Sequence, residues 1–141
     1  MYSINFHFHD RKYNIRDRTR IKRTVGLIFK KEKRKLGELN YVFCSDKYLK
    51  VINNTFLKHN YFTDIITFDL SGPEEEVQGE IYVSIDRVLD NAQSLGVPTQ
   101  EEICRVIFHG ALHLCGFRDK TKAEMQVMRK KEDEYLSYHF K

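Results

Sequence analysis

Two histidines and one aspartate in the last third of the chain have the types and spacing of metal ligands. His109 and His113 lie four residues apart in the stretch HGALHLCGFRDK, and Asp119 follows six residues after the second histidine. On an α-helix, residues four apart project about 40° from each other and one turn apart, so two imidazole nitrogens can reach one cation. A carboxylate oxygen can complete such a site. The pattern predicts a metal site, and the alternative is an ordinary helix end.

A helix over about residues 100–115 is expected to carry both histidines. Thr99 and Glu102 have the spacing of a capping box at its start, in which the glutamate reaches back to the backbone. The helix has one continuous apolar stripe, made of Ile103, Val106, Ile107, Gly110, Ala111 and Leu114. His109 and His113 lie on the flank of this stripe, so they should border the core without entering it.

The residues after this helix predict how a third ligand reaches the histidines. Gly116 has the position of a helix C-cap, and it permits a left-handed turn that returns the chain toward them. Thr121 and Glu124 form the better capping box for the last helix. Asp119 is therefore left without a structural duty, which favours its role as a ligand.

The remaining patterns predict one α+β domain over residues 1–141, with about four strands in a mixed sheet and about five helices. A chain of 141 residues has enough apolar material for one core. The expected strands cover about residues 3–9, 38–45, 63–70 and 79–85. The expected helices cover about residues 18–35, 48–56, 86–95, 100–115 and 122–138, with Gly37 ending the first and Ser45 or Asp46 capping the second.

Positive charge is concentrated in the first of these helices. Residues 11–35 carry 12 of the 24 Lys and Arg against two acidic residues, a net charge of +10 in a chain of +4. Such a segment indicates an anionic partner, plausibly nucleic acid. The alternative is a solvated helix face. The candidate RNA-binding residues are Arg18, Arg20, Lys22, Arg23 and Lys30.

No pattern in the sequence indicates a membrane-spanning protein, a secreted protein, a disulfide-bonded protein or a peptidase. The chain has no apolar run near the ~20 residues of a membrane span, and its N-terminus lacks the apolar stretch of a signal peptide, so we expect a cytoplasmic protein. The three cysteines form no C-x-x-C pair and are expected to be reduced. Gly110 follows His109 where H-E-x-x-H proteases place their general base, which disfavours peptidase chemistry.

Three ordered motifs resemble the YbeY family of bacterial endoribonucleases. HGALHLCGF is similar to the family pattern H-G-x-L-H-L-x-G-[YF]-D-H, TDIITF (63–68) to T-[DN]-V-L-S-F, and GEIYVS (79–84) to G-[DE]-I-x-I-S. The resemblance implies an α+β metalloprotein, with a helix and metal layout related to zinc proteases, that cuts single-stranded RNA. It further implies a role in small-subunit (16S) rRNA 3′-end maturation and ribosome quality control. Ribosomal RNA and the small ribosomal subunit or its precursor would be its partners.

Two departures from the family pattern affect the expected site. The resemblance makes His109 and His113 the first two ligands of one zinc ion, but Asp119 stands where the family has a third histidine, so manganese and iron are alternatives. Leu57 stands where a functional arginine is expected, and Lys58 or Arg118 are candidates to supply its charge. The nucleophile is either a metal-activated water or the ribose 2′-hydroxyl. These departures also leave open a non-catalytic RNA-binding assembly factor with a structural or vestigial metal site.

Aromatic residues suggest further contacts. Tyr61 and Phe62, in an expected loop, could stack on bases, although packing of one of them in the core is the alternative. His139 is expected to be solvated near the chain end. The helix of residues 122–138 is expected to pack through Tyr135, Tyr138, Phe140, Met125, Met128 and Leu136.

Overall fold

Four strands form a mixed sheet whose edge strand borders the candidate site. The computed structural model describes residues 1–59, 63–73 and 75–141. Its strands are β1 (Ser3–Phe8), β2 (Leu36–Cys44), β3 (Ile65–Asp69) and β4 (Val77–Ser84), in the order β1-β2-β4-β3. β2 is parallel to both of its neighbours, β1 and β4, whereas β3 pairs antiparallel with β4. The outer edge of β3 is therefore left without a neighbouring strand in this sheet.

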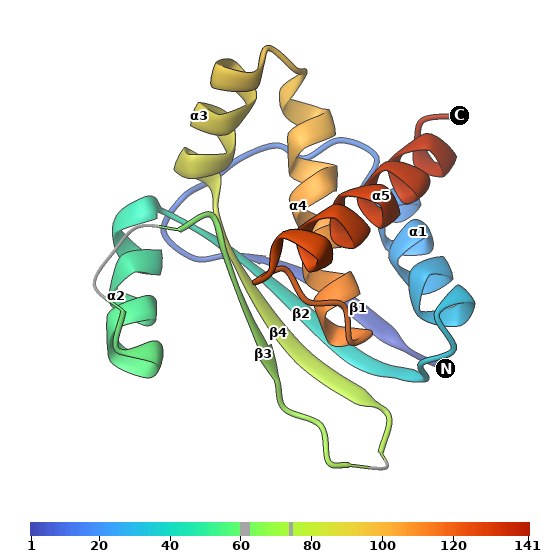
Figure 1. Cartoon of the computed structure of the whole chain (residues 1–141). Coiled ribbons are helices and arrows are strands. Elements are labelled where there is room, and N and C mark those ends of the chain that lie inside the picture. Colours follow the sequence, from blue (N-terminus) through green and yellow to red (C-terminus); the bar gives the residue numbers. More distant parts are fainter. Residues whose placement is uncertain (60–62, 74) are drawn as a thin grey trace.

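Helices cover both faces of the sheet (Figure 1). α1 (Arg18–Lys31), α4 (Thr99–Leu114) and α5 (Lys122–His139) enclose the main core on one face, and α3 (Ile85–Leu95) packs against α4. α2 (Asp46–Leu57) covers the other face over a smaller apolar cluster. The predicted α+β architecture of one domain is confirmed. Within the described part of the chain, no helix has the length and apolar character needed to cross a membrane.

The basic helix is shorter than its sequence pattern predicts. α1 ends at Lys31 instead of near residue 35, and Lys33 takes a left-handed conformation with φ of 61°. Leu36 already pairs with Val77 of β4, and Gly37 lies inside β2. Gly37 is thus no helix stop, because pairing with β4 draws residues 36–37 into the sheet.

One of the two predicted capping boxes forms. At the start of α5, Thr121 accepts a hydrogen bond from the Glu124 backbone, and the Glu124 side chain accepts one from the Thr121 backbone. At the start of α4 the prediction is wrong. Pro98 is the N-cap, there is no side-chain cap, and the Glu102 backbone N–H donates to the Pro98 carbonyl. Glu102 is buried instead, with 6% of its surface exposed.

The C-terminal helix packs differently from the prediction. Tyr135, Met128 and Leu136 are buried as expected. His139 was predicted to be solvated, but it is 3% exposed, and its Nδ1 lies 2.9 Å from the Thr24 hydroxyl oxygen. α5 packs on α1, so its last turn is covered even though it lies near the chain end. The predicted packing is wrong for three residues, which are about half exposed: Met125, Tyr138 and Phe140.

Gly110 lets α4 approach the sheet closely. A Cβ atom at this position would lie 2.8 Å from Ile81 Cδ1 and 3.0 Å from Ile65 Cδ1. We expect Gly110→Ala to lower the free energy of unfolding by about 1 kcal/mol, because overpacking costs ~1–3 kcal/mol and the gain in helix propensity returns only ~1 kcal/mol. Urea unfolding measures the change. Ser94→Ala, at an exposed position of α3, is the control, and equal or higher stability of Gly110→Ala would contradict close packing.

Candidate metal centre

A glycine turn brings Asp119 back to the histidines of α4. Gly116 follows the last turn of the helix with φ of +102°, a conformation that favours glycine. Its N–H donates to the His113 carbonyl at 3.0 Å, and the Phe117 N–H donates to the Leu112 carbonyl at 3.1 Å. These bonds close the end of α4 and reverse the chain as predicted. Asp119 then faces His109 and His113.

The three predicted ligands converge. Oδ2 of Asp119 lies 3.2 Å from Nε2 of His109 and 3.3 Å from Nε2 of His113. The three ligand atoms all lie within 4.8 Å of one another, and the three residues are partly buried. Ligand atoms bound at ~2.0–2.2 Å to one tetrahedral zinc ion stand at similar separations. The group could therefore hold a metal ion.

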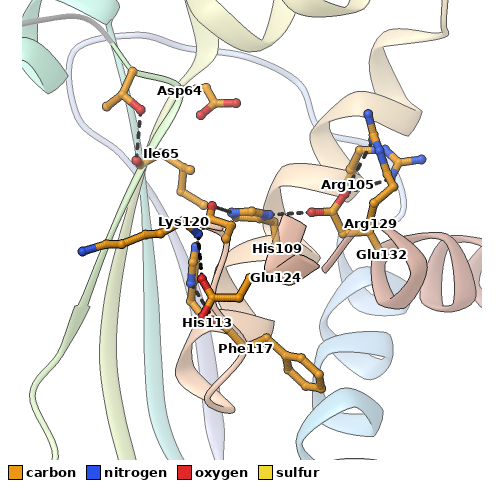
Figure 2. A network of polar contacts seen from close by, with 12 residues as sticks. Asp64, Ile65, Arg105, His109, His113, Phe117, Lys120, Glu124, Arg129 and Glu132 are labelled. Atoms are coloured by element: carbon orange, nitrogen blue, oxygen red, sulfur yellow. Dashed lines mark hydrogen bonds and ion pairs between the residues drawn. The ribbon is translucent and has the colours of Figure 1, made fainter. Parts of the chain in front are cut away.

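Hydrogen bonds at the opposite ring nitrogens leave Nε2 of each histidine available (Figure 2). Nδ1 of His113 lies 3.0 Å from the Phe117 carbonyl oxygen, and Nδ1 of His109 lies 2.5 Å from Oε2 of Glu132. Because these oxygens accept hydrogen bonds, each Nδ1 carries the hydrogen, and in the neutral ring the lone pair is on Nε2. The donor set thus fits a cation, since ligand histidines usually donate their other N–H to a carbonyl or a carboxylate.

Glu132 of α5 contacts His109 at the candidate site and was not predicted from the sequence. Its side chain is 8% exposed and is bound by Nη1 of Arg105 at 2.8 Å, with Nη1 of Arg129 3.7 Å away. Glu132 follows buried Met128 by four residues, so it is an acidic residue on the inward face of α5. That position is the signal that could have identified it, because a buried carboxylate needs a partner.

Known proteins of one family resemble this chain. The family model described as Endoribonuclease YbeY matches residues 4–139. The chain belongs to the YbeY family. It is 49% identical over 135 residues to the Endoribonuclease YbeY of Cytophaga hutchinsonii, covering 96% of this chain and 94% of that protein. It is 43% identical over 142 residues to that of Flavobacterium psychrophilum, covering 100% and 99%. The solution structure of TM1509 from Thermotoga maritima aligns with a TM-score of 0.68 and 25% identity, covering 96% and 89%.

The two histidines of this YbeY chain differ in basicity. Burial lowers the pKa of His113, and the neighbouring His109 lowers it further. Burial also disfavours a charged His109, but the hydrogen bond and negative charge of Glu132 outweigh it and raise the pKa of His109. Burial likewise opposes ionisation of Glu132, yet its bonds to His109 and Arg105 hold its pKa below the ordinary value. Glu132 is therefore an ionised acceptor that fixes the ring of His109.

The candidate metal centre opens into a groove of about 980 Å³. β3 and the end of α2 line one side, and α4 and α5 line the other. Leu57 lines this groove, whereas Lys58 and Arg118 are not among its lining residues. Over the described residues, the basic side chains that line it are Arg105, Lys120 and Arg129. Lys58 and Arg118 remain predictions for the charge that Leu57 lacks.

The predicted RNA-binding residues of α1 lie apart from the groove. Arg18, Arg20, Arg23 and Lys30 are exposed and Lys22 is half-buried, but none of them lines it. Figure 1 shows α1 at the β1 side of the sheet, with α4 between it and β3. An RNA that contacts α1 would therefore use a second surface. Tyr61 and Phe62, the candidate stacking residues, lie outside the described residues.

Proposed function

We propose that this member of the YbeY family is a metal-dependent endoribonuclease that cuts single-stranded RNA. His109, His113 and Asp119 would hold the ion. One observation carries the proposal: the Nε2 atoms of both histidines converge on one carboxylate oxygen of Asp119, while Glu132 and the Phe117 carbonyl hold the opposite nitrogens. The names of the relatives supply the reaction class.

Zinc is the ion that we propose, with manganese and iron as alternatives because the third ligand is a carboxylate. Held by these three residues, a zinc ion would supply a water whose pKa is lowered to about 7 and a positive charge beside a phosphoryl oxygen. The protein's own part is to fix the ligands. Glu132 and the Phe117 carbonyl set the tautomer and orientation of the rings, and the turn at Gly116 places Asp119.

Cations beside the centre suit a phosphodiester substrate. Nη1 and Nη2 of Arg105 are engaged by Glu132 and Asp133 at 2.8 Å each. Lys120 has no ion pair within the described part of the chain, and in Figure 2 its side chain extends from beside the histidines toward the sheet. Arg129 is more than half exposed, with Glu132 3.7 Å away. We therefore propose that Lys120 and Arg129 meet the phosphates on either side of the metal.

The biological substrate that we propose is ribosomal RNA in the small subunit or its precursor, at the 3′ end of 16S rRNA and in ribosome quality control. The family membership and the localised positive charge of α1 support this assignment. The exposed residues Arg18, Arg20, Arg23 and Lys30, with half-buried Lys22, would bind the RNA backbone at a distance from the groove.

A duplex RNA with a single-stranded 3′ extension tests the proposed function. We expect cleavage in the extension at least tenfold faster than in the duplex, because the reactive groups lie inside a groove that an extended strand can enter. Elemental mass spectrometry should find about one zinc, manganese or iron ion per chain. Tight, salt-sensitive RNA binding without any product would instead support the non-catalytic assembly factor.

A further inference from the structure

Glu102 is a carboxylate buried in the wall of the groove. Glu102 is 6% exposed and lines the groove. Among the residues that the structure describes, its side chain makes no hydrogen bond and no ion pair. Its side-chain oxygens are not among the fully enclosed unpaired atoms, so they retain access to the groove. Burying an unpaired carboxylate is costly. Because Glu102 does not cap α4, a capping contact does not offset this cost.

Asp64 lies near Glu102, just before β3 on the opposite side of the groove. Burial raises the pKa of Asp64, and the positive charge of His109 opposes that shift. Among the described residues, its side chain accepts one hydrogen bond, from Nδ2 of Asn91 at 3.4 Å. Burial also raises the pKa of Glu102, and the negative charge of Asp64 adds to that shift. Figure 2 shows Asp64 on the side of His109 that is opposite His113. Along α4, Glu102 also lies on the opposite side of His109 from His113. Two carboxyl groups therefore share one end of the groove.

Glu102 is separated from the metal ligands along α4. Glu102 precedes His109 by seven residues, which places it about 10 Å away along the helix on nearly the same face. Val106 lines the groove on the turn between them. Proton transfer needs groups within about 2.6–3.2 Å, or one intervening water. Glu102 is therefore too far away to act on the reacting phosphate, and it faces a neighbouring part of the RNA.

The charges around Glu102 restrict what it can bind. A phosphate would be repelled by two acidic groups. A metal ion is disfavoured because the positive charges of Arg105 and Arg129 act on Glu102. A neutral nucleobase is repelled neither by the acidic groups nor by the arginines. Its exocyclic amino group donates hydrogen bonds that a carboxylate accepts.

We propose that Glu102 and Asp64 form a nucleobase subsite that accepts hydrogen bonds from the exocyclic amino group of a base beside the scissile phosphate. This inference rests on the proposed function in taking RNA as the ligand. Adenine, cytosine and guanine carry such an amino group. Uracil does not, and its two carbonyl oxygens flank its single N–H, so they would repel the carboxylates. The groove therefore discriminates against uracil at this position.

Single-stranded oligonucleotides that differ in one base test the subsite. At each position in turn, the base is varied among the four. Binding to the metal-loaded protein is followed by fluorescence anisotropy, and cleavage is the second readout. At one position we expect uracil to bind at least about fivefold more weakly than the other three bases. In Glu102→Gln this difference should fall to within about twofold, because an amide can donate to a uracil carbonyl. Asp64→Asn should also reduce the difference in affinity between uracil and the other three bases.

Glu101→Gln is the matched control, since it removes the same charge from the adjacent residue, which does not line the groove. It should keep the parent's preference, and thermal unfolding checks that all variants are folded. Equal affinity for all four bases at every position would overturn the subsite. So would a Glu102→Gln variant whose affinity rises equally for all bases, because that result shows only relief of charge repulsion. Base-dependent binding without any cleavage would support the subsite and refute the proposed nuclease activity.

Discussion

His109→Ala is expected to lower the rate of RNA cleavage at least about a thousandfold and to remove most of the bound metal. His109 provides one of three ligand atoms that lie within 4.8 Å of one another, and the remaining two would hold an ion weakly. Metal stabilisation of transition-state charge is worth several kcal/mol, and each 1.36 kcal/mol changes the rate tenfold. Removing the ion from the parent protein with a chelator should give the same loss, and adding the ion back should reverse it only in the parent.

The control for this variant is His7→Ala. His7 is exposed on β1 and its ring contacts Asn40, far from the groove, so the variant should keep its metal and its activity. Gel-resolved cleavage of a labelled single strand and elemental analysis of the same preparations provide both readouts. If chelated parent protein or His109→Ala cleaved RNA at the full rate, the metal-dependent mechanism would be wrong.

Glu132→Ala is expected to lower both stability and metal affinity. The side chain of Glu132 is 8% exposed and accepts hydrogen bonds from His109 and Arg105. Breaking a buried ion pair costs about 3–5 kcal/mol, and we expect the lower end, about 3 kcal/mol, because Arg105 keeps its bond to Asp133. Loss of a residue that orients a ligand typically weakens metal binding 10–100-fold. Denaturant unfolding and competition with a chelating dye measure the two effects.

Asp133→Ala separates these effects from a general loss of charge on α5. Asp133 binds the same arginine, but its side chain is 58% exposed, so its loss should cost less than about 1 kcal/mol and leave metal affinity unchanged. Glu132→Gln retains the shape of the side chain and an oxygen acceptor. Its stability and metal affinity should therefore lie between those of the parent and of Glu132→Ala. Unchanged metal affinity in Glu132→Ala would show that Glu132 does not orient His109.

Features set by residues close together in the chain were largely predictable from the sequence. The spacing of His109 and His113, the left-handed glycine after α4 and the capping box of Thr121 and Glu124 all act within one or two helical turns. The apolar stripe of α4 likewise follows from helical periodicity. Asp119 could be predicted as the third ligand because only a short reversal of the chain separates it from His113.

Local pattern failed where a competing contact comes from a distant part of the chain. Gly37 resembles a helix stop, but β2 already pairs with β4 at Leu36. Thr99 and Glu102 have the spacing of a capping box, yet the side chain of Glu102 lies at the groove with Asp64 nearby. His139 lies near the chain end, but the packing of α5 on α1 buries it beside Thr24. In each case tertiary contacts outweigh a local preference of about 1 kcal/mol.

The sequence by itself determined the fold class and the family, and it predicted the three residues that converge at the candidate metal centre, because periodicity, turn chemistry and short motifs are local properties. Only the tertiary structure decided what surrounds those ligands. Glu132 reaches His109 across 23 residues of chain because α5 packs on α4, and Asp64 lies near Glu102 because β3 lies alongside α4. Such pairings depend on long-range packing of elements whose own sequences do not encode their partners, so the residues that tune the site emerge only from the folded chain.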